Sequence, residues 1–239
     1  MHNSWSAMNL ASELSGSNAI ARIQDRATAY WTRQLQSRLI ASLNGVLADN
    51  QANSSGDMVF DATGEASPAF SATHVIDAAH TLGDRMSDLA AIAMHSDTFK
   101  TALKNDLIDT QTESDGRPIR TFRGLAVIVD DGLPKDTQSD STSIYTSVLF
   151  RRGSVGWGLT EPRIAAGTEV ENLPSAGNGG GQEILHSRVN LAVHPEGFTW
   201  DEGTVAGSSP TLAELADASN WTRTAERNNV GIAFLQTQE

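Results

Sequence analysis

The stretch Thr121-Phe-Arg-Gly-Leu-Ala-Val-Ile-Val-Asp-Asp-Gly-Leu-Pro134 predicts a buried β-strand that ends in a tight turn. Its apolar run is rich in valine and isoleucine, which favour strands. Asp130-Asp131-Gly132 follows at once, and Asp-Gly is a strong turn signal. Two later blocks, Ile144–Gly158 and Glu183–Trp200, have the same strand-forming character. The second half of the chain is therefore expected to be rich in strands.

The composition fits a globular protein and excludes several chemistries. The chain has 239 residues, a formal net charge of −12 and no cysteine. Disulfides, thiolate metal sites and cysteine nucleophiles are therefore excluded. The negative charge argues against extensive contact with nucleic-acid phosphates. No apolar run is long enough to span a bilayer and no signal-peptide pattern is present, so neither secretion nor a membrane partner is expected.

A long amphipathic helix is predicted from Ser17 to Ala48. We expect Ser17 to cap it and Asn44-Gly45 to weaken its last turn. At 1.5 Å per residue the helix is about 48 Å long. A compact globule of this size is about 45 Å wide, so the helix indicates an elongated or flattened molecule. Apolar residues recur along it at spacings of three and four: Ile20, Ile23, Ala27, Trp31, Leu35, Leu39, Leu43 and Val46.

Shorter elements are predicted on either side of the opening stretch. A helix over 71–89 should bury Val75, Ile76, Ala79, Leu82, Met86 and Leu89. A buried strand at 91–95, a helix from Asp97 to about Leu107 with Phe99, Leu103 and Leu107 inward, and the strand at 124–129 form a strand–helix–strand unit. The remaining expectations are a loop over 49–70 with a short strand at 58–60, an exposed segment at 136–143, a flexible loop at 172–182, one strand with a solvated face at 183–194, a helix from Ser209-Pro210 to about Ser219 and a last strand at 230–235.

The residues that could form a catalytic, metal or phosphate site are better explained as parts of turns, loops and surface ion pairs. Asp130 and Asp131 form a turn rather than a metal or acid–base pair, because the strand must reverse there. The glycines at 177–181 precede a strand and lack the Gly-Lys-Ser/Thr of a phosphate loop. His74 and Asp77, one helical turn apart, are expected to form a solvated ion pair. No catalytic, metal or cofactor site is predicted, and no cofactor is expected.

The six histidines also fail to form a metal-binding pattern. None has the spacing that places two ligands on one helix face. His186 and His194 share a predicted strand face but lie about 27 Å apart along an extended strand, so they cannot bind one ion together.

Basic side chains are the best candidates for contacts with other molecules. Arginines fill much of the polar face of the long helix, and a second group lies near a strand start. Because the chain is acidic overall, a partner subunit is favoured over DNA for these groups. The candidate subunit contacts are Arg22, Arg26, Arg33, Arg38, Arg117, Arg120, Arg123, Asn172, Asn178, Gln182 and Arg188.

The order of the sequence blocks resembles the major capsid proteins of tailed bacteriophages, which share the Hong Kong-97-type fold. Each block is weakly specific alone, but the ordered set covers nearly the whole chain. The segments that carry the resemblance are Ser4–Ala11, Ala29–Arg33, Ala93–Asp97 with Leu103 and Leu107, Gly124–Asp131, Phe150–Gly158, Val189–Trp200, Ser209–Ala216 and Asn220-Trp221.

The resemblance implies an α+β fold with a long spine helix, a peripheral (P) domain and an axial (A) domain. The helix and the start of the P domain would occupy 1–55, the A domain 56–142, the P-domain strands 143–197, and the return to the A domain 198–239. Loops at 57–68 and 136–143 would line ring centres, and the loop at 172–182 would lie at junctions between rings. The expected absence of an E-loop and N-terminal arm is a departure from the family, and the lysine cross-link of some relatives is not carried over to Lys100, Lys104 or Lys135.

The implied function is structural. Copies would assemble into hexamers and pentamers of an icosahedral shell around double-stranded DNA, without sequence-specific binding. Scaffold, portal or decoration proteins would be further partners, with assembly in the host bacterial cytoplasm and a final place in the virion capsid. Two alternatives remain: an encapsulin-like nanocompartment shell, or an intracellular α+β enzyme or binding domain. A deep apolar pocket with convergent polar groups would favour the last.

Overall fold

The computed structural model describes residues 1–112, 118–137 and 143–239. It divides into two compact units, and the chain passes between them within α2 (Ala19–Asn53), β9 (Val155–Thr160) and β12 (Asn190–Pro195). Unit 1 comprises 1–39 and 157–193, and unit 2 comprises 40–156 and 194–239. The mixture of helices and strands agrees with the predicted α+β class.

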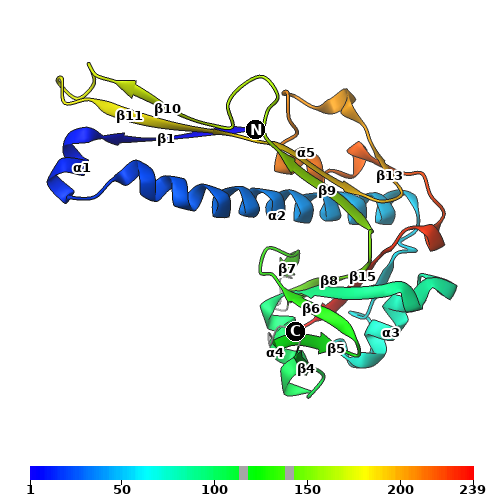
Figure 1. The fold of residues 1–239 in the computed structure, drawn as a ribbon. Coiled ribbons are helices and arrows are strands. Elements are labelled where there is room, and N and C mark those ends of the chain that lie inside the picture. The colour runs from blue at the N-terminus through cyan, green and yellow to red at the C-terminus, as the bar shows by residue number, and fades with distance from the viewer. Residues whose placement is uncertain (113–117, 138–142) are drawn as a thin grey trace. The chain divides into compact units, whose positions relative to one another are not determined.

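Unit 1 packs a three-stranded antiparallel sheet along the first part of α2 (Figure 1). The strand order is β1 (His2–Met8), β11 (Gln182–Arg188) and β10 (Thr168–Leu173). A short helix, α1 (Asn9–Ser15), joins β1 to the turn before α2. The Trp31 indole donates a buried hydrogen bond of 2.8 Å to the Ser187 hydroxyl and so ties α2 to the central strand.

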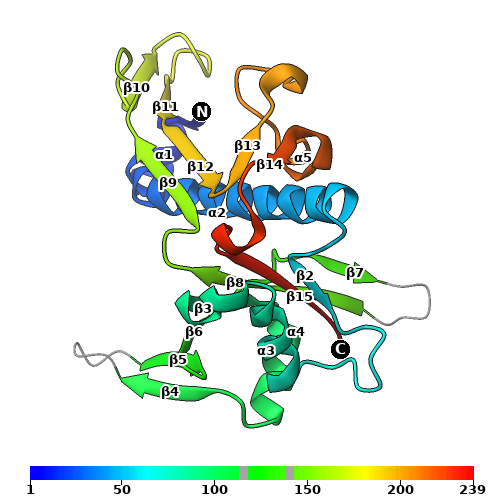
Figure 2. The ribbon, with the colours of Figure 1, turned by 90° about the vertical axis from the view of Figure 1, so that its right-hand side faces the viewer.

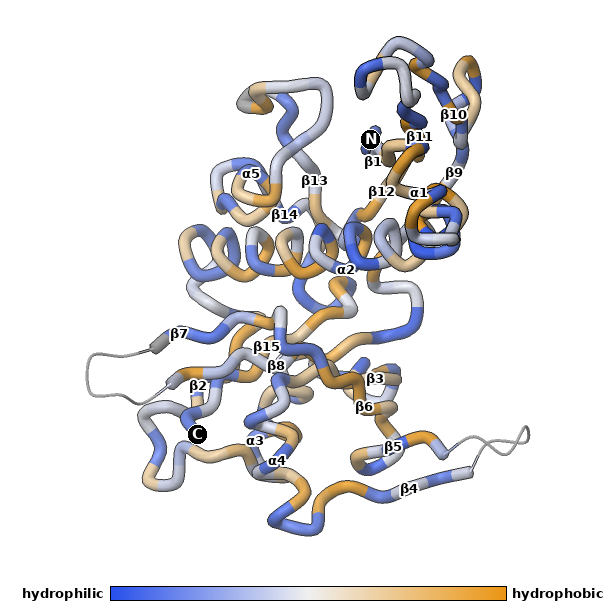
Figure 3. Tube along the Cα trace, turned by 90° about the vertical axis from the view of Figure 1, so that its left-hand side faces the viewer, coloured by the Kyte–Doolittle hydropathy of each residue, from blue (hydrophilic) through white to orange (hydrophobic). Residues whose placement is uncertain are grey.

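Unit 2 is built on a mixed sheet in the order β2-β15-β8-β3-β6-β5-β4, with β7 paired to β8. Helices α3 and α4 lie against one face of this sheet (Figure 2). Strands β3 and β6 run parallel and are apolar along most of their length (Figure 3), which explains their central position. The largest buried side chains of the core include Phe70, Ile92, Met94, Phe122, Leu149 and Leu235.

The elements of unit 2 follow one another along the chain, and two further strands, β13 and β14, pair with each other. Their bounds are β2 (Val59–Asp61), α3 (Ala72–His80), η1 (Gly83–Asp88), β3 (Leu89–Met94), α4 (Ser96–Lys104), β4 (Asp109–Thr112), β5 (Pro118–Phe122), β6 (Leu125–Val129), β7 (Lys135–Thr137), β8 (Ser143–Arg151), β13 (Phe198–Trp200), η2 (Glu202–Thr204), α5 (Leu212–Ala216), η3 (Ala218–Asn220), β14 (Trp221–Arg223), η4 (Arg227–Asn229) and β15 (Ile232–Gln238).

The long helix is confirmed, although its ends differ from the prediction. The Asn18 side chain, not Ser17, accepts the hydrogen bond from the Ala21 backbone N–H that caps the first turn. Asn44-Gly45 does not end the helix, which continues to Asn53. The helix backbone at Gly45 packs directly against Trp221 and Leu215 of the same unit, which leaves no room for a side chain there.

Three shorter helices differ from their predictions for local reasons. The helix predicted over 71–89 ends at His80 because Gly83 takes a φ of +62°. Ile76 and Met86, which were predicted to be buried, are exposed. In α4 the cap is His95 rather than Asp97, and Ala102 replaces Leu103 on the buried face. The last predicted helix begins after Thr211, which forms a capping box with Glu214, rather than at Ser209-Pro210.

Several strands also differ from the prediction in their bounds or were not predicted. The stretch 183–194 forms two strands, β11 and β12, that separate at Val189. The predicted alternation holds within β12, where Leu191 and Val193 are half-buried while Asn190 and His194 are exposed. Strands β1 and β10 were not predicted. The region expected to be a loop at 172–182 is a hairpin whose strands include its first two residues and its last one.

Other residue-level predictions met mixed outcomes. The turn at Asp130-Asp131-Gly132 is confirmed, and the Asp130 carboxylate accepts a 2.9 Å hydrogen bond from the Gly132 N–H. The solvated His74–Asp77 ion pair is wrong, because His74 is buried beside Phe60 and its Nδ1 has no hydrogen-bond partner. Of the predicted exposed segment 136–143, residues 138–142 lie outside the described part of the chain.

Candidate interaction surfaces

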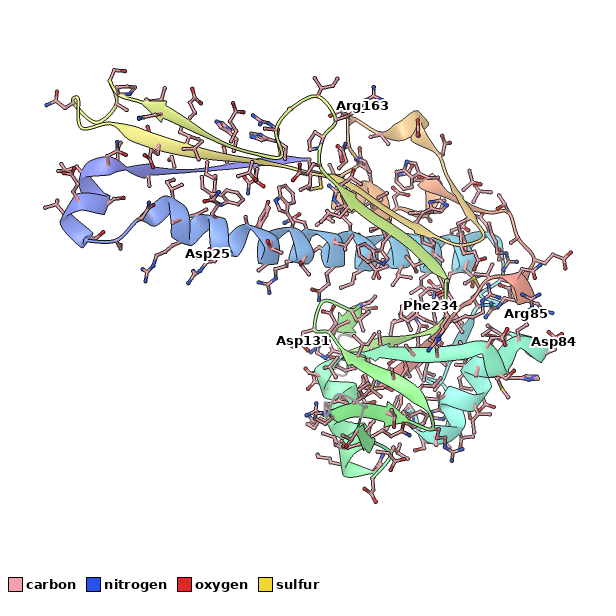
Figure 4. The ribbon with its side chains drawn as sticks, viewed as in Figure 1. Asp25, Asp84, Arg85, Asp131, Arg163 and Phe234 are labelled. Atoms are coloured by element: carbon pink, nitrogen blue, oxygen red, sulfur yellow. The ribbon has the colours of Figure 1, made fainter. Side chains whose placement is uncertain are left out.

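An arginine row runs along the exposed face of the first part of α2. Arg22, Arg26 and Arg33 are all exposed, and their directions around a 3.6-residue helix differ by only about 40°. Buried Trp31 lies on the opposite side of the helix. Figure 4 shows Asp25, one residue before Arg26, on the side of α2 that faces away from the sheet of unit 1. Within the described ranges, no ion pair or hydrogen bond engages the three guanidinium groups.

Arg38, the fourth candidate on this helix, does not belong to the arginine row. Its direction differs from that of the row by about 140° on a helical wheel. The side chain is half-buried, and this burial lowers the pKa of the guanidinium from its ordinary value. Burial makes Arg38 less available for an outside partner than the three arginines of the row.

A small apolar pocket lies beside the arginine row. It has a volume of about 160 Å³ and is lined by Trp5 of β1 and by Ile23, Arg26, Ala27 and Tyr30 of α2. The Trp5 and Tyr30 rings meet edge to face with centroids 5.3 Å apart. We call this the Trp5–Tyr30 pocket. Arg26 belongs both to its rim and to the arginine row, so apolar and cationic surfaces adjoin there.

Helix α1, at one end of unit 1, exposes leucines and one carboxylate rather than arginines. None of its residues is buried, and the side chains of Leu10 and Leu14 are 56% and 81% exposed. Its start is tied to the tip of the β10–β11 hairpin by a 3.1 Å hydrogen bond from the Asn9 N–H to the Gly181 carbonyl. Glu13 is its one charged residue. An exposed leucine pair on a helix with no buried residue is a candidate contact surface.

The hairpin candidates divide into exposed and internally engaged residues. Asn178 lies at the tip with a φ of +57°, and Asn172 is exposed on the edge strand β10. Gln182 is half-buried in the central strand, paired on both sides. Arg188 donates to the Glu169 carboxylate at 3.0 Å and to the Ala166 carbonyl at 3.1 Å, so its guanidinium is already used within unit 1.

The predicted group of arginines near β5 is only partly described. Arg117 lies outside the described residues. Arg120 places its guanidinium 5.0 Å from the centroid of the Phe99 ring, a cation–π contact within unit 2. Arg123 is exposed in the β5–β6 turn with a φ of +47°, followed by Gly124 at +88°. Arg120 and Arg123 are both exposed, but Arg120 is already engaged by the Phe99 ring, so Arg123 is the freer contact candidate of the two.

A cluster of polar side chains around His95 resembles a catalytic or ligand-binding site. The His95 ring lies tilted against the Tyr145 ring with centroids 4.8 Å apart, and its Nδ1 accepts from the Asp97 N–H at 3.2 Å. The Tyr145 hydroxyl donates to Asp97 at 2.7 Å, and this bond is the main reason why the pKa of Asp97 lies below its ordinary value. Lys135 stands 3.8 Å from the same carboxylate. These contacts cap α4 and join it to β7 and β8.

A second polar network was not predicted from the sequence. The Arg223 guanidinium donates to both Asp57 carboxylate oxygens, at 2.7 and 2.9 Å, and Asn50 donates to the same group at 2.6 Å. Burial would raise the pKa of Asp57, but these hydrogen bonds hold it below the ordinary value. Arg227 is more deeply buried, and burial lowers its pKa to about 10. The network joins the end of α2 to β14 and η4 within unit 2.

The described residues offer no obvious metal centre. His2 Nε2 lies 3.1 Å from His186 Nδ1, and His186 Nε2 lies 3.1 Å from Glu171, so the three form a chain across the sheet of unit 1. Among residues 1–112, 118–137 and 143–239, no three His, Cys, Asp or Glu side chains are grouped as ligands of one ion. Over the same ranges, no helix combines the length and apolar character needed to cross a membrane.

Comparison with known proteins identifies the family. The sequence model of the Gp13-like family, described as "Major capsid protein 13-like", matches residues 12–231. The major capsid protein of Bacillus phage SPP1 is 37% identical over 231 residues, which are 96% of this chain and 68% of that protein. These matches confirm the resemblance stated from the sequence, and they favour neither the nanocompartment nor the enzyme alternative. The chain belongs to the Gp13-like family of phage major capsid proteins.

Proposed function

We propose that this chain adopts the Hong Kong-97-type fold and assembles into hexamers and pentamers of an icosahedral shell. Membership of a major capsid protein family is the observation that carries the proposal. The 35-residue helix α2 supports it as a spine helix. Unit 1 combines the start of that helix with strands from 157–193, which is what a peripheral domain requires.

The domain assignment follows from the same proposal. Residues 1–55 supply the spine helix and the start of the P domain, 56–142 the A domain, 143–197 the P-domain strands and loop, and 198–239 the return to the A domain. Strand β8 (Ser143–Arg151) is the exception, because it pairs with β15 and β3 in the sheet of unit 2 and so groups with the A domain. The segment at 57–68, which includes β2, lines the centres of rings together with the segment at 136–143, of which 138–142 lie outside the described residues. The hairpin tip around Asn178 lies where rings meet.

Rings of six and five subunits need heterologous contacts, in which two different surfaces of the same chain meet. The exposed arginine row and the exposed hairpin residues Asn172 and Asn178 support such contacts, because side chains there have room for an outside partner. Arg120 and Arg188 support them less, since each already has a partner in its own chain.

The proposed role is structural, with no catalytic step. The family is one of structural capsid proteins. The net charge of −12 suits a container that encloses double-stranded DNA without gripping it, since phosphate binding depends on cationic neutralisation. The shell forms in the host bacterial cytoplasm and becomes the virion capsid, where scaffold, portal or decoration proteins are its further partners.

Electron microscopy of the purified chain over a range of concentrations tests the proposal. Closed shells, rings or flat sheets of sixfold units support it. A matched variant with R22E, R26E and R33E keeps the buried face of α2 intact and should assemble less. If the wild-type chain stays monomeric at high concentration while retaining its fold, self-assembly by this chain alone is refuted.

A further inference from the structure

Helix α1 is anchored at Asn9 to the β10–β11 hairpin but buries none of its own side chains. Its leucines Leu10 and Leu14 are four residues apart, so they lie on the same face. Glu13 flanks that face, because its direction differs from that of Leu10 by about 60°. With Leu14 81% exposed, the subunit's own Trp5–Tyr30 pocket does not cover it.

The Trp5–Tyr30 pocket has the complementary character. Its lining is two aromatic rings, Ile23 and Ala27, with the guanidinium of Arg26 at the rim. A cavity of about 150 Å³ holds a benzene-sized apolar group, so about 160 Å³ suits one branched aliphatic side chain. Arg22, one helical turn before Arg26, extends the positive charge beside the pocket.

We propose that α1 of one subunit docks on the neighbouring subunit, with Leu14 in the Trp5–Tyr30 pocket and Glu13 facing Arg26. The inference rests on the proposed function, because it assumes that copies of this chain meet. Helix α1 and the Trp5–Tyr30 pocket both belong to this chain. The Leu14 side chain matches the apolar lining of the pocket, and the Glu13 carboxylate matches the Arg26 guanidinium. The occupant is therefore a second copy. The two surfaces differ, so the contact is heterologous and compatible with a closed ring.

Disulfide trapping between single-cysteine variants tests this contact directly, because the chain contains no cysteine. One variant carries L14C and the other A27C, so a disulfide between positions 14 and 27 must join two copies. The matched control replaces A27C by I164C, since Ile164 is 96% exposed in the same unit. We expect the 14–27 bond to form at least tenfold faster than the 14–164 bond under mild oxidation, as read on non-reducing gels with mass spectrometry of the linked peptides.

A charge exchange checks the polar half of the contact. E13R should slow the 14–27 reaction about twofold, as an exposed ion pair contributes little, and adding R26E to the partner should restore it. L14A in the wild-type background should raise the concentration needed for assembly about tenfold. Circular dichroism of each variant verifies that the fold is retained.

The outcomes separate the docking contact from the proposed function. Shells without preferential 14–27 bonding overturn the docking and leave the proposed function standing. Selective 14–27 bonding without shells supports the docking and counts against self-assembly by this chain alone. Bonding between two L14C copies as fast as between L14C and A27C also overturns the proposal, because it means that two α1 helices meet each other.

Discussion

Gly45 lies within α2 and allows Trp221 to approach the helix backbone. The Trp221 indole donates a buried 2.8 Å hydrogen bond to the Leu215 carbonyl at this place. A Cβ on residue 45 would overlap both the indole nitrogen and that carbonyl oxygen. Alanine favours helix over glycine by about 1 kcal/mol, but overpacking a fitted contact costs about 1–3 kcal/mol. The steric cost should win.

We therefore expect G45A to lower the free energy of unfolding by up to about 2 kcal/mol. Urea denaturation followed by tryptophan fluorescence measures it. G64A is the matched control, because nothing lies within 4 Å of a Cβ there. An increase in stability for G45A would show that the helix shifts easily and that the contact with Trp221 is loose.

Asp57 makes stability depend on pH in a predictable direction. Its pKa in the folded state lies below the ordinary value, so the folded state favours the ionised form. The resulting stabilisation is present above the unfolded pKa of about 3.9 and is lost as pH falls through the lower folded pKa. Because the carboxylate is 38% exposed, solvent screening limits the effect to about 1 kcal/mol.

D57N should be less stable than the wild type by about this amount at neutral pH, and the difference should vanish near pH 2. Urea denaturation at the two pH values measures it. D84N, at an exposed aspartate, should match the wild type at both. A D57N penalty that persists unchanged in acid would mean that the side chain acts by packing rather than by charge.

At the scale of the element, unit 1 depends on the bond between α2 and β11. Ser187 is buried and accepts from the Trp31 indole. S187A leaves that N–H buried without an acceptor, which should cost about 1–3 kcal/mol. In W31F the donor is absent, so adding S187A should cost much less. A double-mutant cycle by thermal or urea unfolding should give a coupling of at least about 0.5 kcal/mol; additive effects would contradict the role assigned to the bond.

Elements with strong local signals could be predicted, and those that depend on distant partners could not. The periodic apolar stripe of α2 and the valine-rich β6 were identified from sequence because their own residues carry the pattern. Strand β1 was missed because its segment is short and mostly polar, and it becomes a strand by pairing with β11, about 180 residues away. The early end of α3 depends on Gly83 in a left-handed conformation, which the apolar pattern around it concealed.

The candidate interaction surfaces follow the same rule: their local patterns could be predicted, and their contacts with distant segments could not. Spacing alone places Arg22, Arg26 and Arg33 on one helix face. The Trp5–Tyr30 pocket was not predicted, because it joins a residue of the unpredicted β1 to residues of α2. The internal partners of Arg120 and Arg188 were also invisible, since an ion pair or ring contact across strands leaves no local pattern in the sequence.

For the whole molecule, the net charge of −12 should oppose association. An exposed arginine–carboxylate pair contributes at most about 1 kcal/mol, so general repulsion between acidic subunits should outweigh it. Raising the salt concentration from about 0.01 M to about 0.1 M shortens the screening length from about 30 Å to about 10 Å. The protein concentration at which light scattering appears should therefore fall as salt rises.

The triple variant R22E, R26E and R33E supplies the control for this prediction. Its added negative charge should make the dependence on salt steeper than in the wild type. If salt instead dissolves wild-type assemblies, attraction between opposite charges dominates the interface, and the apolar component of the contact is small.

Helix α1 has a consequence for how a shell could grow. Seven residues that bury none of their side chains are too few to hold a helix by themselves, so its order depends on what covers it. If α1 docks as proposed, each docking event includes an ordering cost, which keeps the individual contact weak and short-lived. Weak contacts let a wrongly placed subunit leave before its neighbours lock it in. The proposed docking of α1 would thus allow misplaced subunits to dissociate while the lattice grows.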